Sequence, residues 1–255
     1  ADIVPATLGI TAVVGTIRKN DDPVEGRRLF NSAAVISNGE LLGFQDKTLL
    51  PEYDVFDDPR YFEPADHRRI FEVNGVKLGV VVCEDFWNDK TFWKERLYEN
   101  DPTDEVLAMG ADIIVSVNAS PYNKGKIRLR CDMVAHRAKA NKIPIVFVNL
   151  VGGNDGIIFD GASLIADQEG EEEGEQDGPD RDPAIARLEG DDRRVAPPAT
   201  NCTRETGERL LLPARRVAVD AIGRHHDGAA AADFTAASRR VRSAAGSCLV
   251  VGLGL

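Results

Sequence analysis

The sequence predicts an α/β fold in which helices cover a mixed β-sheet. Short apolar runs rich in β-branched residues recur through the first 168 residues, amphipathic segments alternate with them, and Asn-Gly turns join neighbouring runs. Strands that are apolar on both faces are typical of sheets covered by helices. A chain of 255 residues can bury a substantial core in one large domain or two smaller ones.

The first part of the chain consists mainly of predicted strands and hairpins. A strand is predicted at residues 8–17, where the run LGITAVVGTI is followed by a turn-like KNDDP segment. Hairpins are predicted at Asn38-Gly39 and at Asn74-Gly75, because this dipeptide favours two-residue turns. Residues 46–66 form a long irregular stretch, and its aromatic residues indicate a functional loop instead of a disordered one.

The second part alternates helices and strands. Apolar residues at helical spacing predict helical structure over residues 89–109, interrupted near Asp101-Pro102. A second, amphipathic helix is predicted from Lys126 to Lys142, with buried strands before and after it. Residues 157–167 are predicted to form a further hairpin.

The composition changes after residue 168, so we divide the chain into a domain at residues 1–168 and a tail at residues 169–255. Six of the ten residues from Glu171 to Asp180 are acidic, which predicts a solvated, disordered segment. The tail contains no lysine and a single aromatic residue, Phe234. A genuine disordered tail and translation out of frame both fit this bias, and the complete loss of lysine favours the second.

The charge and the cysteines limit the partners and the compartment. A formal net charge of −11 argues against nucleic acid and anionic membrane surfaces as partners. The sequence shows no signal peptide or long apolar span, and none of its four cysteines forms a Cys-x-x-Cys pair. We therefore expect a reducing cytoplasm, with no bound metal and no cofactor.

Cys83 stands where a predicted strand at residues 78–82 meets the acidic residues Glu84 and Asp85. A thiol at a strand-to-helix turn lies close to backbone N–H groups, which favour the thiolate and suit a nucleophile. From these residues alone a buried structural cysteine remains the alternative, because free cysteine is among the most buried residue types.

Four segments in sequence order together resemble one family. They are KTLLPEYDVFDDPRYFEP from Lys47, GVVVCEDFWND from Gly79, VSVNASPYNKGK from Val115 and NLVGGNDGIIFDGASLIAD from Asn149. Residues 8–168 are similar to the glutaminase domain of glutamine-dependent NAD+ synthetases, a nitrilase-like carbon–nitrogen hydrolase. The resemblance implies a four-layer αββα sandwich and a Glu-Lys-Cys catalytic triad.

The resemblance implies two catalytic side chains. Cys83 is the expected nucleophile, which attacks the side-chain carboxamide of glutamine, releases ammonia and leaves a thioester for water to hydrolyse. Lys47 and the backbone N–H of Glu84 are expected to stabilise the tetrahedral anion.

Four side chains are implied in substrate binding. Tyr53 and Ser120 match residues that hold glutamine, with loop packing and strand-end capping as their structural alternatives. Glu84 lies where it can contact the substrate amino group. Asp58 stands where the family has a glutamate, and its shorter side chain puts its role in question.

The sequence departs from the family pattern in two respects. It contains no motif like FPELxxTGYP, which carries the family's general base, so we expect a domain that is incomplete at its N-terminus and has little glutaminase activity. It also lacks the SGGxDS phosphate loop of the synthetase half. ATP-dependent NAD+ synthesis is therefore expected only from a longer parent that contains the synthetase domain.

Two other functions remain open. A free-standing nitrilase-family amidase or carbamoylase would use the same lysine and cysteine on another amide, whereas an inactive scaffold would retain the sandwich for homo-oligomer formation. Alkylation by a glutamine-mimicking electrophile separates these functions. Labelling of Cys83 that glutamine blocks indicates a glutaminase site, and labelling without selectivity over Cys131 indicates the scaffold.

Overall fold

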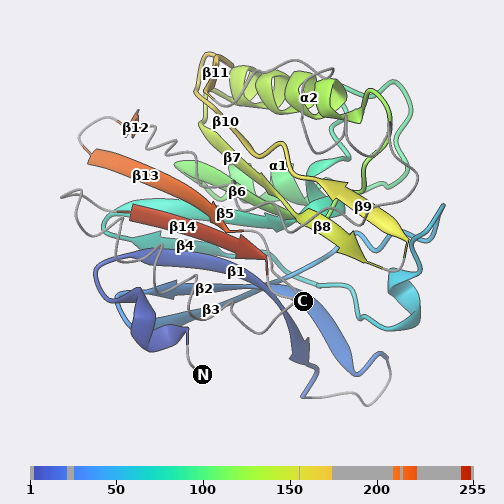
Figure 1. The fold of residues 1–255 in the computed structure, drawn as a ribbon, viewed down its shortest axis with the longest axis horizontal. Coiled ribbons are helices and arrows are strands. Elements are labelled where there is room, and N and C mark those ends of the chain that lie inside the picture. Colours follow the sequence, from blue (N-terminus) through green and yellow to red (C-terminus); the bar gives the residue numbers. More distant parts are fainter. Residues whose placement is uncertain are drawn as a thin grey trace, which may run out of the picture.

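The structure is a computed structural model that describes six stretches of the chain. They are residues 3–21, 26–154, 156–173, 209–212, 215–222 and 248–253. Two six-stranded sheets lie face to face, and the α-helices of these stretches cover the outer face of one of them (Figure 1). None of these helices is long and apolar enough to cross a membrane.

The strands of sheet A run in the order β12 (Arg209–Leu212), β13 (Arg215–Ile222), β14 (Cys248–Leu253), β1 (Thr11–Lys19), β2 (Leu29–Ser37) and β3 (Glu40–Asp46). Of these, β1, β2 and β3 form an antiparallel meander. Asn38 and Gly39, between β2 and β3, adopt positive φ angles of 50° and 83°. This backbone shape is that of a two-residue hairpin turn and confirms the first predicted hairpin.

Sheet B is mixed and carries the central part of the site. Its strands run in the order β11 (Glu172–Glu173), β10 (Leu164–Ala166), β7 (Ile145–Asn149), β6 (Ile113–Asn118), β5 (Val76–Val82) and β4 (Ile70–Val73). Strands β4 and β5 form the second predicted hairpin, which is also confirmed. Strands β5, β6 and β7 are parallel, so their carboxyl ends meet at one edge of the sheet.

Two apolar layers bury both faces of β5. Val80 and Val82 pack in the layer between the two sheets. Val81 faces the other layer, where sheet B contacts α1 (Pro102–Ala108) and α2 (Lys126–Asn141). Because a slip of one residue would exchange these faces, the two layers fix the register of the strand that ends at Cys83.

The helix predicted over residues 89–109 is present only in its second part, as α1. In the preceding segment, side chains bind backbone groups that a helix would otherwise use. The Asn88 side chain donates to the carbonyl of Tyr98, and Asp89 accepts a backbone N–H two residues further on. Asp101 then caps α1 by accepting its first free N–H groups.

The hairpin predicted at residues 157–167 is also wrong. Strand β9 (Ile157–Asp160) pairs instead with β8 (Val151–Asn154) in a separate two-stranded ribbon, and β10 pairs with β7 in sheet B. Alternating apolar residues indicated two strands correctly but could not show which partner each one has.

The predicted αββα sandwich is seen in part. In the described stretches, α1 and α2 cover sheet B, and no α-helix covers the outer face of sheet A. Within the predicted tail at residues 169–255, the structure describes β11 to β14, and β14 pairs in parallel with β1. The remaining tail residues lie outside the described part, so the disordered tail and the incomplete N-terminus stay predictions.

Candidate active site

Cys83 occupies a sharp turn at the carboxyl end of β5. It begins the 3₁₀ turn Cys83–Phe86, and its backbone φ is 50°, in a region that residues other than glycine rarely adopt. Such a conformation costs about 1–3 kcal/mol and is concentrated at functional sites. The backbone N–H of Ala119, at the end of the neighbouring strand, forms a hydrogen bond with Cys83. The thiol is thus held at the sheet edge, as predicted.

Lys47 places a buried cation beside this thiol. It directly follows β3 and is 4% exposed, and its Nζ lies 2.6 Å from Oδ2 of Asp58. Burial lowers the pKa of Lys47, but its interactions with Cys83 and with the carboxylates of Asp58 and Asp85 raise it more, so the net shift is upward. The lysine is therefore an ammonium ion at neutral pH. Although the side chain of Asp58 is shorter than the glutamate expected at this position, its carboxylate still reaches Lys47.

The resting form of Cys83 is the neutral thiol. Burial raises the pKa of Cys83, the Lys47 ammonium lowers it, and the neighbouring Glu84 carboxylate raises it again. Because burial is the largest of these effects, the net shift is upward. A nucleophilic thiolate at neutral pH therefore requires a group that accepts the thiol proton.

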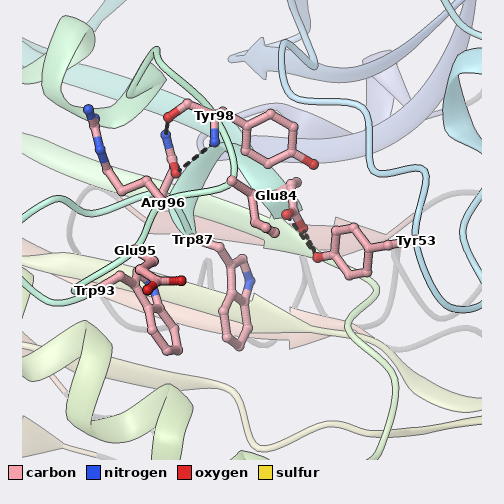
Figure 2. Close-up of a pocket in the computed structure, with 9 residues that line it drawn as sticks. Tyr53, Glu84, Trp87, Trp93, Glu95, Arg96 and Tyr98 are labelled. Atoms are coloured by element: carbon pink, nitrogen blue, oxygen red, sulfur yellow. Dashed lines mark hydrogen bonds between the residues drawn. The ribbon is translucent and has the colours of Figure 1, made fainter.

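Glu84, the residue that follows Cys83 in the chain, lines a cavity of about 300 Å³. Its carboxylate accepts the Tyr53 hydroxyl at 2.8 and 3.0 Å, and Tyr98 donates to it as well. Figure 2 shows Trp87 and Trp93 on the same side of the cavity, below Glu84 in this view. A carboxylate among aromatic rings is well suited to bind an ammonium group.

Asp85 ties the Cys83 turn to the chain that follows Lys47. Its buried carboxylate accepts the backbone N–H groups of Thr48 at 3.0 Å and Leu49 at 2.7 Å. Burial raises the pKa of Asp85 to about 6, although these N–H groups and Lys47 oppose the shift. The sequence shows this acid beside Cys83, but only its burial shows that it positions the two chain segments.

A buried polar network fixes the loop that carries Ser120. The Ser120 N–H donates to Oδ1 of Asn149 at 2.8 Å, and its carbonyl accepts a hydrogen bond from the Arg130 guanidinium at 3.2 Å. Arg130 lies fully buried on α2 and pairs with Asp160 at 2.8 Å. These bonds hold the chain around Ala119 against Cys83.

The structure brings together the residues predicted from the sequence. Lys47 and Asp58 form one side of the thiol environment, Glu84 and Tyr53 form the neighbouring cavity, and Ser120 follows the Ala119 N–H that contacts Cys83. Sequence reasoning missed three other contributors, which are Asp85, Trp87 and Tyr98. Of these, Tyr98 lies in the segment predicted to be helical, which gave no signal for a cavity wall. Within the described residues, no group of His, Cys, Asp and Glu is placed to hold a metal.

Comparison with known proteins matches residues 3–172 to the carbon–nitrogen hydrolase family. A glutamine-dependent NAD(+) synthetase from Synechocystis is 39% identical over 172 residues, which cover 67% of this chain and 30% of that protein. The corresponding Thermotoga maritima protein is 36% identical over 165 residues, covering 64% and 26%. The chain therefore spans less than a third of these relatives.

Solved structures show the same likeness. The glutamine-dependent NAD+ synthetase of Acinetobacter baumannii, determined with ADP, has a TM-score of 0.55 and 37% identity, covering 64% of this chain and 28% of that one. A carbon–nitrogen hydrolase from Helicobacter pylori has a TM-score of 0.50 and 25% identity, covering 62% and 56%. The NAD+ synthetases extend well beyond the region shared with this chain.

Proposed function

This chain belongs to the carbon–nitrogen hydrolase family, and from that premise we propose that Cys83 cleaves the side-chain amide of glutamine. The observation that carries the proposal is the positive φ of Cys83, which holds its thiol between the Lys47 ammonium and the Ala119 N–H. A displayed thiol with a fixed cation beside it suits nucleophilic attack on a carbonyl carbon.

The chemistry follows from these positions. The Cys83 thiolate forms a C–S bond with the amide carbon, and the carbonyl oxygen becomes an anion that Lys47 and local N–H groups stabilise. The C–N bond then breaks and ammonia leaves with a proton from the thiol. Water hydrolyses the resulting thioester to glutamate and restores the thiol. Asp58 keeps the Lys47 ammonium oriented while the thioester forms and while it is hydrolysed.

The cavity supports an amino-acid amide as substrate. Glu84 offers a carboxylate to the α-ammonium group, and Tyr53 and Tyr98 hold that carboxylate in place. The names of the relatives, glutamine-dependent NAD(+) synthetases, are consistent with glutamine itself. In a longer parent protein the released ammonia would pass to a synthetase region.

Covalent labelling of Cys83 tests this function directly. The chain is treated with L-2-amino-4-oxo-5-chloropentanoic acid, an electrophilic glutamine mimic, and the modified residue is found by peptide mass spectrometry. We expect labelling at Cys83 that glutamine blocks, with Cys83→Ser unlabelled and Cys131→Ser labelled as in the parent chain. Labelling that glutamine leaves unchanged would refute the glutaminase, and blocking only by other amides would favour a different amidase.

Turnover is a separate measurement. The sequence contains no FPELxxTGYP motif to supply the family's general base, and general acid–base catalysis contributes about 10²–10⁴ in rate. We expect ammonia release from glutamine to be slower than that of an intact NAD+ synthetase by roughly this factor. Release at the rate of the intact enzyme would contradict this expectation.

A further inference from the structure

Arg130 is a buried arginine that fastens the loop following β6. Its side chain lies on α2 and is fully buried. Its Nη2 donates to the carbonyls of Ser120 and Pro121, each at 3.2 Å, and its Nη1 donates to the carbonyl of Gly161 at 3.4 Å. One guanidinium thus joins the loop that follows β6 to the turn that follows β9.

Asn149, the last residue of β7, makes the same connection from the sheet. Its Oδ1 accepts the Ser120 N–H at 2.8 Å, and its Nδ2 donates to the carbonyls of Gly161 at 2.9 Å and of Ser120 at 3.2 Å. Buried backbone groups are nearly always paired, because leaving one without a partner costs free energy. The loop is therefore held from α2 on one side and from β7 on the other.

The ion pair between Arg130 and Asp160 leaves part of each group unused. Arginine and a carboxylate pair most strongly through two parallel N–H···O bonds. Here Nη1 lies 2.8 Å from Oδ1 of Asp160, whereas Nε of Arg130 and Oδ2 of Asp160 have no hydrogen-bond partner in the described part of the chain. The guanidinium is thus oriented towards the loop carbonyls at the expense of a two-bond contact with the acid.

The loop held in this way carries an N–H group that contacts the nucleophile. Ala119, one residue before Ser120, donates its backbone N–H to Cys83. Burial is the largest influence on the pKa of Cys83 and raises it, whereas the Lys47 ammonium and this N–H lower it. A donated hydrogen bond stabilises the thiolate more than the thiol. The ionisable side chains that also act on Cys83 are Lys47, Tyr53, Asp58, Glu84 and Lys126.

We propose that Arg130 is a positioning residue for the nucleophile, because it presents the Ala119 N–H to the Cys83 sulfur. The inference rests on the proposed function and adds to it a residue that acts through the backbone of another segment. If the loop moved away from Cys83, the Lys47 ammonium would have to favour the thiolate without this hydrogen bond.

Replacing the ion pair as a unit tests the inference. The double variant Arg130→Met/Asp160→Asn removes both charges together, so neither is left buried without its partner. Arg130→Lys keeps a cation beside Asp160 but lacks the planar fork that reaches three carbonyls, and it replaces the double variant if that chain does not fold. Met133→Ala is the matched control, because Met133 is a fully buried residue of the same helix whose truncation lowers stability.

Two measurements follow the thiol and the loop separately. Iodoacetamide labelling of Cys83 is measured by peptide mass spectrometry between about pH 6 and 9, and hydrogen exchange of the Ala119 amide is measured by NMR. We expect the double variant to label Cys83 about tenfold more slowly at each pH, since a hydrogen bond to a charged group is lost. Its Ala119 amide should exchange about tenfold faster relative to that of Val117 in β6.

The other two variants should separate positioning from stability. We expect Arg130→Lys to change both measurements in the same direction as the double variant, by about threefold or more. Met133→Ala should change the labelling rate of Cys83 by less than about threefold, because its effect is on the packing of α2 and not on the loop carbonyls.

Two results would overturn the inference without touching the proposed function. The first is an unchanged labelling rate with unchanged relative exchange of Ala119 in a folded variant. The second is equal slowing in Met133→Ala, which would assign the effect to stability. The glutaminase proposal is tested separately by glutamine-protected labelling of the parent chain with the chloroketone. If that protection is absent, the proposed function fails, and a positioning role for Arg130 in catalysis fails with it.

Discussion

Replacement of Arg137 by methionine should both destabilise the fold and damage the cavity. The Arg137 guanidinium is fully buried on α2 and forms ion pairs with Asp89, at 3.0 Å, and with Asp101. These two acids bracket the irregular segment that carries Trp93 and Tyr98, so Arg137 connects this wall of the cavity to the helix layer. Methionine keeps much of the apolar stem but leaves both acids without their cation.

The size of the expected stability loss follows from the burial of Arg137, Asp89 and Asp101. The side chain of Arg137 is 0% exposed and those of both acids are 5% exposed, so water can compensate little for the lost partner. Removing one member of a buried ion pair costs about 3–5 kcal/mol. For a domain of this size, that loss corresponds to a fall in Tm of roughly 6–20 °C.

Urea denaturation followed by tryptophan fluorescence measures the loss. Arg128→Met is the control, because Arg128 lies on the same helix, is 81% exposed and pairs with Asp132 at 3.8 Å. We expect the control to lose less than about 0.5 kcal/mol. Arg137→Met should also weaken the protection of Cys83 by glutamine under conditions where the variant is folded. A loss below about 1 kcal/mol would refute the reasoning, since it would mean that the buried acids do not need this cation.

Three further perturbations test separate parts of the site and its support. Lys47→Met removes the ammonium that lowers the pKa of Cys83, so iodoacetamide labelling at pH 8 should slow by about fivefold or more; an equal rate would contradict this. The pKa of Asp85, about 6, lies above its ordinary 3.8, so its contribution to stability is complete below pH 3.8 and is lost as the pH rises through 6. Relative to Asp85→Asn, the parent chain should gain up to about 3 kcal/mol as the pH falls from 7 to 4, and a difference independent of pH would argue against the shift. Gly79→Ala would place a Cβ 2.2 Å from a methyl group of Val106, so we expect a loss of about 1–3 kcal/mol in urea denaturation; an unchanged midpoint would show that α1 can move away.

Local features of the fold could be predicted because their causes lie within a few residues. Asn38-Gly39 and Asn74-Gly75 favour positive φ angles by themselves, so both hairpins form where the sequence places them. The apolar run before Cys83 likewise predicts a buried strand. By contrast, the helical spacing after Asp89 was misleading, because contacts with the distant Arg137 and the side chain of Asn88 hold that segment in another shape.

The residues of the candidate site likewise fall into those predicted from the sequence and those found only in the structure. The order of the sequence motifs predicted Cys83, Lys47, Asp58 and Glu84 as site residues, because the motifs resemble those of a known family, and their roles stay predictions. Only the tertiary structure decided that Asp85 joins two chain segments and that Trp87 and Tyr98 line one cavity with Glu84. Burial and charge environment depend on which distant segments pack together, and in this protein the chain that follows β3 packs against the turn that follows β5.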